Sequence, residues 1–146
     1  MTDDFETAEK FGQGRALYAP FLGLLILVAQ QGIFFAWDWG DDSLLQIALW
    51  LVFAVAMLML LMTGGGIFLS KRARELANDE VTQLNRLGAI QAGFVVAMVM
   101  GFLVWAISPF EPLHAQRAAN FIVSTSLASA FIAFGVAEMR TQAGGA

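Results

Sequence analysis

The side chains of this chain that could perform acid–base, nucleophilic or metal chemistry are few. The sequence has one histidine, one tyrosine and no cysteine, which excludes disulfides, cysteine-ligated metals and thiol catalysis. His114 stands between two apolar stretches, and one histidine in a loop does not supply the axial ligands that haem needs. The chain also has no glycine-rich phosphate loop and no nucleophilic serine motif. We therefore expect no enzyme activity, no cofactor and no metal site.

Charged residues avoid the middle of every long apolar stretch in this sequence. Because charges inside a membrane mark proton relays and ion paths, this pattern disfavours a proton-coupled transporter. Glu138 stands at the end of the last apolar stretch, close to Arg140, and we interpret it as an interfacial residue rather than a carrier site.

Amides and hydroxyls do enter the apolar stretches, where such groups are typical of hydrogen bonds between helices. They are Gln30, Gln31, Gln46, Gln91, Asn120, Ser124, Thr125, Ser126 and Ser129. An alternative interpretation is a ligand pocket lined by Gln30, Gln46 and Asn120.

The overall composition explains why reactive groups are scarce. Of the 146 residues, 58% are hydrophobic and 14% are charged, and the mean hydropathy is +0.67. Soluble domains are about 45–50% apolar and about 25% charged, so this composition argues against a disordered chain and against an ordinary soluble domain. The net charge of -4 provides no basic surface, and we expect no direct contact with nucleic acid.

Four apolar stretches are long enough to be transmembrane helices, which need about 20 residues. They predict an all-α fold, a four-helix transmembrane bundle of two antiparallel hairpins. We place the spans at about 16–37, 44–70, 87–109 and 118–137, within a membrane domain over residues 16–137. An acidic tail over residues 1–15 precedes this domain, and a short tail over residues 138–146 follows it.

The distribution of lysine and arginine predicts the orientation, because these residues gather on the cytoplasmic side. Arg117 is the one basic residue on the side of the two short hairpins, where acidic residues also gather. The other seven flank the opposite side and are Lys10, Arg15, Lys71, Arg72, Arg74, Arg86 and Arg140. Both termini and the link over residues 71–86 are therefore expected in the cytoplasm, with a lipid bilayer around a multi-pass protein.

Small residues recur every four positions in the third and fourth predicted spans. Such faces let membrane helices approach closely, where packing and hydrogen bonds hold them together. The residues are Ala89, Gly93, Ala97 and Gly101 in the third span, and Thr125, Ser129, Ala133 and Ala137 in the fourth. We expect the two faces to meet within one molecule; the alternative is contact with a second copy in a homo-oligomer.

Three consecutive glycines occupy positions 64–66, near the cytoplasmic end of the second predicted span. Because glycine weakens a helix, we expect a bend or a close helix crossing there. The crossing, with the first span, is the interpretation we favour over a hinge.

The link over residues 71–86 holds much of the charge of the chain. Basic residues stand next to the membrane and acidic residues follow them, with Leu76, Leu84 and Leu87 on a shared side if the segment is helical. This pattern fits either a solvated connector or a docking surface for a cytoplasmic protein. The candidate docking residues are Arg74, Glu75, Asp79 and Glu80.

The same link resembles that of small, functionally uncharacterised bacterial inner-membrane proteins of four spans. The matching residues are Glu75 and Leu76, followed by Asp79, Glu80 and Thr82. Some members of that group resemble proteins encoded beside helix-turn-helix regulators, which implies a membrane partner of a transcription factor. The resemblance implies a bacterial origin, and with it a place in the bacterial cytoplasmic (inner) membrane; the group has no known activity to carry over.

We therefore predict a non-enzymatic membrane protein that binds or regulates a cytoplasmic partner through residues 71–86. Two alternatives remain: a small channel or transporter subunit that forms a pore as an oligomer, and an accessory subunit of a larger membrane complex.

Overall fold

The computed structural model describes residues 2–29, 43–65, 72, 79–110 and 114–144. Within these ranges the chain forms four long helices and no strand. They are α1 (Thr2–Ala29), α2 (Ser43–Thr63), α4 (Glu80–Ile107) and α5 (Ala115–Gly144). The all-α prediction is confirmed for this part of the chain.

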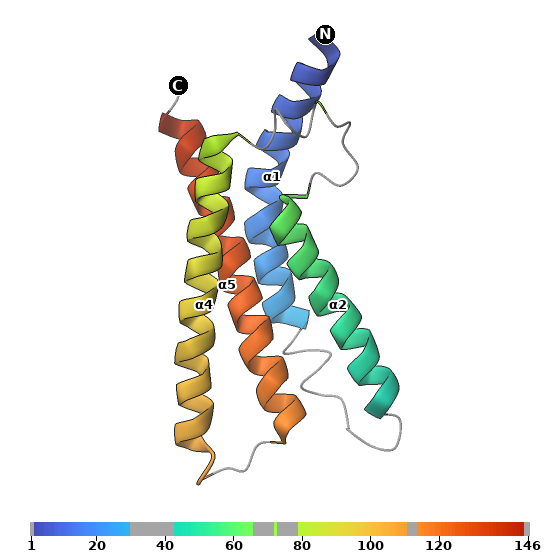
Figure 1. The fold of residues 1–146 in the computed structure, drawn as a ribbon, viewed down its shortest axis with the longest axis vertical. Coiled ribbons are helices and arrows are strands. Elements are labelled where there is room, and N and C mark those ends of the chain that lie inside the picture. Colours follow the sequence, from blue (N-terminus) through green and yellow to red (C-terminus); the bar gives the residue numbers. More distant parts are fainter. Residues whose placement is uncertain (1, 30–42, 66–71, 73–78, 111–113, 145–146) are drawn as a thin grey trace.

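Helix α5 lies at the centre of the fold. Both α1 and α4 pack along it, whereas α2 contacts it at few positions and leans away from the other three helices (Figure 1). Of the most apolar 18 residues in each helix, 44% are buried in α5, 28% in α1 and 6% in α4. The core is therefore built around α5, with Ala128, Phe131 and Phe134 among its most buried side chains.

Glycines allow α1 and α4 to lie close to α5. A Cβ atom added to Gly23 of α1 would be 2.7 Å from the carbonyl oxygen of Ala128. One added to Gly93 of α4 would be 3.0 Å from both the Cβ of Ala130 and the carbonyl oxygen of Ser126. Close backbone approach at small residues is the usual way in which membrane helices associate.

Three of the described helices are long and apolar enough to cross a membrane: α1 from Glu6 onward, α4 and α5. The apolar part of α2, Ile47–Thr63, is shorter. Large apolar side chains cover the outer faces of the bundle, among them the exposed Phe21, Phe94 and Phe102. Soluble monomers rarely expose such extensive apolar surface, so it supports a hydrocarbon surrounding.

Helix α2 ends at the glycines where a bend or crossing was expected. Gly64 has a φ of 64° and Gly65 a φ of 77°, a left-handed conformation that glycine adopts without strain. The amides of Gly64 and Gly65 donate to the carbonyls of Leu61 (3.3 Å) and Leu60 (3.0 Å), which is a Schellman cap.

The favoured interpretation was a close crossing with the first span: a Cβ on Gly65 would be 3.4 Å from the ring of Phe11 in α1, but α1 and α2 contact each other at few positions. The alternative, a bend within a continuing helix, was wrong because α2 ends at Thr63, and residues 66–70 of the predicted span lie outside the described part.

Successive helices run in opposite directions, so both termini and the start of α4 lie at one end of the molecule (Figure 1). At this end the helices extend beyond the predicted spans. Helix α1 includes nearly all of the segment expected as an acidic tail, and α4 begins at Glu80, within the predicted link. We call this the terminal end of the bundle.

Candidate functional site

An ion pair between α1 and α5 is buried at the terminal end of the bundle. Nη2 of Arg15 donates to Oε2 of Glu138 at 2.7 Å. Arg15 is 8% exposed and Glu138 is 5% exposed. Arginine and glutamate are almost never buried without a partner, and here each is the partner of the other. An ionisable pair within helices that can cross a membrane is the default candidate for a functional site.

Helix α4 completes the hydrogen bonding of this pair. Nη2 of Arg15 also donates to Oγ1 of Thr82 at 2.9 Å, and Nδ2 of Asn85 donates to Oε1 of Glu138 at 3.0 Å. Asn85 donates further to Oγ1 of Thr141 in α5 at 3.2 Å. The pair and its partners therefore connect α1, α4 and α5, and we call these five residues the polar network.

Aromatic rings surround the guanidinium group of Arg15. Its Cζ atom is 5.9 Å from the ring centroid of Phe11 and 5.4 Å from that of Phe134. Both distances are within the range of cation–π attraction, which is stronger in a desolvated setting. Both side chains of the pair are buried, so its electrostatic attraction is weakly screened.

The local sequence explains how the two charges meet. Gly135 lies one turn before Glu138, and a Cβ atom there would collide with the ring of Pro20 in α1. The absence of that atom lets α1 and α5 approach closely next to the ion pair. Thr82 is held in turn by the N-cap of α4, because its amide donates to Oδ1 of Asp79 at 2.8 Å.

Two cavities flank the ion pair, and Arg15 lines both. The first, of about 480 Å³, lies between α1, α2 and α5 and is largely apolar; its lining includes Leu22, Leu61 and Phe131. The second, of about 290 Å³, lies between α1, α4 and α5 and is lined by polar residues that include Asp79 and Glu138. Among the described residues, no group of three or more histidine, aspartate and glutamate side chains is placed to hold a metal ion.

The candidate docking residues are described only in part. Arg74 and Glu75 lie outside the described residues, as does most of the link. Asp79 caps α4, a structural role that the sequence analysis did not assign, and Glu80 is exposed in the first turn of that helix.

The small-residue faces are placed as follows. Ala89 and Gly93 are buried against α5, whereas Ala97 and Gly101 are half-buried, and no described atom lies within 4 Å of a Cβ built on Gly101. The four residues of the α5 face are all half-buried. Gly93 meets Ser126 and Ala130 instead, which are one position further along α5 than Thr125 and Ser129.

The hydroxyls of α5 were expected to bond between helices, and this expectation was wrong. Ser126 donates to the carbonyl of Val123 at 3.0 Å, and Ser129 donates to that of Thr125 at 2.7 Å. Thr125 donates to the carbonyl of Phe121, and Ser124 donates to the side chain of Asn120. Backbone carbonyls within the same helix are always in reach of these short side chains, so they bond locally.

Of the three residues of the alternative ligand pocket, Gln30, Gln46 and Asn120, the structure describes the side chain of Asn120. Gln30 lies outside the described residues, and so does the side chain of Gln46. Asn120 is buried in α5.

The sequence analysis missed the ion pair. It counted Arg15 as an orientation signal and placed Glu138 at the interface beside Arg140, which is exposed. A usable signal was present, because opposite charges stand at the ends of two apolar stretches expected on the same side of the membrane. Which charges meet depends on helix rotation, and the sequence pattern did not indicate that.

No protein-family model matches the chain, and the searches of curated proteins and of solved structures also found no match.

Proposed function

We propose that the chain is a multi-pass protein of the bacterial cytoplasmic membrane, with both termini and the link over residues 71–86 in the cytoplasm. Three helices of sufficient length and apolar composition support the membrane setting. The proposed orientation rests on the seven basic residues on one side, among them Lys10 and Arg140. In this setting we also propose α2 as a fourth span, because its 21 residues rise about 31 Å, close to the hydrocarbon thickness of about 30 Å.

The proposed activity is the non-enzymatic binding of a cytoplasmic regulatory protein through the link and the start of α4. The observation that supports it is the anchoring of the first turns of α4. Thr82 and Asn85 bind the buried ion pair, while Glu80 and Asp79 stand exposed immediately before them. Acidic side chains on such an anchored turn lose little entropy when a basic partner binds.

Neutralisation of the link carboxylates tests this proposal. The variant Glu75→Gln/Asp79→Asn/Glu80→Gln removes three negative charges, and asparagine retains the ability to cap α4. We expect a soluble protein recovered with the tagged wild type in mild detergent to be lost at least tenfold from this variant. The matched control is Glu6→Gln/Glu9→Gln, which neutralises exposed carboxylates of α1 at the same end. Equal recovery from all three proteins would contradict the proposal.

A second candidate is a subunit that associates within the membrane, either with its own copies as a small channel or as an accessory subunit of a larger complex. The packing of α4 favours it, because one side of this helix packs against α5 while most of its surface is exposed. No described atom lies within 4 Å of a Cβ built on Gly101. Because the chain has no cysteine, Gly101→Cys introduces one thiol for crosslinking in native membranes. A crosslinked product with Gly101→Cys, and none with Val99→Cys on the other side of α4, would support this candidate.

A further inference from the structure

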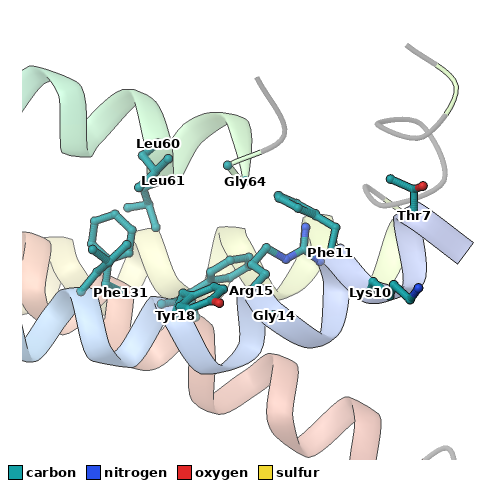
Figure 2. Close-up of a pocket in the computed structure, with 14 residues that line it drawn as sticks. Thr7, Lys10, Phe11, Gly14, Arg15, Tyr18, Leu60, Leu61, Gly64 and Phe131 are labelled. Carbon is teal, nitrogen blue, oxygen red and sulfur yellow. The ribbon is translucent and has the colours of Figure 1, made fainter. Parts of the chain in front are cut away.

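The apolar cavity between α1, α2 and α5 is a groove with a polar end and an apolar end. Thr7 and Lys10 lie at one end, while Leu60, Leu61 and Phe131 lie at the other, as Figure 2 shows. The groove exists because α2 lies against the bundle at few positions and leaves a space of about 480 Å³ beside α1. This volume is within the range of about 300–1,000 Å³ that is usual for small-molecule sites.

The length of the groove matches one leaflet of a bilayer. Its lining runs along α1 from Thr7 to Leu22, which is 15 positions, or about 22 Å at about 1.5 Å per residue. A bilayer with its headgroups is about 40–45 Å thick, so one leaflet is about 20–22 Å. The polar end of the groove lies at the terminal end of the bundle, where the headgroups would be in the proposed membrane setting.

Lys10 is the charged lining residue at the polar end of the groove, and its ammonium group can bind a phosphate. Nζ of Lys10 is 2.7 Å from Oε1 of Glu6, but both side chains are mostly exposed, and exposed pairs of this kind are weak. A lipid phosphate can therefore compete for the ammonium group. Arg15 lies further along the groove, but Glu138 already matches its charge, so Lys10 is the cation that we assign to the headgroup.

We propose that this groove binds one phospholipid of the cytoplasmic leaflet, with its phosphate at Lys10 and an acyl chain between α1 and α2. The lipid fills the space that the loose packing of α2 leaves open, and it contributes apolar contacts to Leu60 and Phe131. This inference rests on the proposed membrane setting and is independent of the cytoplasmic partner.

Native mass spectrometry of the full chain in mild detergent, titrated with dioleoylphosphatidylglycerol, tests the proposal. The wild type should bind one lipid at least tenfold more tightly than any further lipid. Leu60→Trp fills the groove from α2 and should weaken this first binding at least tenfold. Leu58→Trp makes the same change at an exposed position of α2 outside the groove, and it should bind as the wild type does.

Two further measurements separate the contribution of the lipid phosphate from that of the acyl chain. Lys10→Gln should weaken the first binding severalfold, while Arg140→Gln, at an exposed position outside the groove, should leave it unchanged. Inorganic phosphate and glycerol 3-phosphate, which have no acyl chain, should not displace the lipid. If Leu60→Trp does not fold, Lys10→Gln still tests the proposal. The exposed side chain of Lys10 contributes little packing, so this variant should fold.

Three results would overturn the proposal. The first is equal lipid binding by the wild type, Leu60→Trp and Lys10→Gln, which would indicate unspecific surface lipid. The second is displacement by glycerol 3-phosphate, which would indicate a small-anion site. The third is a dimer that retains no lipid and dissociates in Leu60→Trp, which would show that a second copy occupies the groove.

Discussion

At the residue scale, the burial of Arg15 and Glu138 is stabilised by the ion pair that they form with each other. Arg15 and Glu138 are each at least nine-tenths buried, and each is the ion-pair partner of the other. Loss of one partner leaves the other charge in a low-dielectric setting, which costs about 3–5 kcal/mol when a buried pair is broken. Loss of both charges removes the penalty together with the attraction.

We therefore predict that Arg15→Gln and Glu138→Gln each lower the free energy of unfolding by about 3–5 kcal/mol. The double variant should lose much less than the sum, because two amides can still bond to each other and to Thr82 and Asn85. Unfolding in mixed micelles, followed by far-ultraviolet circular dichroism, measures all three. Additive losses would contradict a direct coupling between the two residues.

At the scale of the single helix, the N-cap of α4 sets where that helix begins and so where Thr82 lies. Asp79→Ala removes the acceptor for the Thr82 amide and should cost about 1 kcal/mol of stability. Asp79→Asn keeps an acceptor oxygen and should cost far less. The comparison uses the same unfolding measurement, and equal losses from the two variants would mean that charge, rather than capping, is the contribution of Asp79.

The contact between α1 and α5 depends on a missing side chain at Gly135. Gly135→Ala would place a methyl group against the ring of Pro20, and we expect a loss of about 1–3 kcal/mol from this overpacking. Gly88→Ala is the matched control in α4, where no described atom lies within 4 Å of the new Cβ. That control should leave stability unchanged or raise it by up to about 1 kcal/mol through helix propensity. A neutral Gly135→Ala would show that α1 and α5 can separate without loss.

At the scale of the whole molecule, the alternating direction of the helices places the start of α5 at the end opposite the termini (Figure 1), and His114 directly precedes that helix. With the proposed orientation, His114→Cys should react with a membrane-impermeant maleimide in intact cells after removal of the outer membrane. Glu6→Cys, at an exposed position of α1 on the terminal side of Lys10, should react only after the inner membrane is permeabilised. The absence of native cysteine makes both measurements specific, and the reverse pattern would invert the proposed topology.

The sequence by itself determined the helical class and the apolar stretches on which the helices form, but it did not indicate that α1 begins at Thr2, within the segment expected as a tail. The helical class and the apolar stretches are local properties, because an apolar run of sufficient length satisfies its own backbone hydrogen bonds only as a helix. The sequence analysis was wrong where local signals compete, as at Gly64, where glycines end α2 instead of bending it, and in α5, where hydroxyls bond to their own helix.

Only the tertiary structure decided that α5 is central, that α2 stands apart and that Arg15 meets Glu138. The two charges are 123 positions apart in the sequence, and their meeting depends on the rotation of α1 and α5 about their axes. That rotation follows from which glycines fit against which neighbours, as Gly135 does against Pro20 and Gly23 against Ala128. Such fits are set by the close packing of distant segments, and this is why the polar network and the groove became evident only in three dimensions.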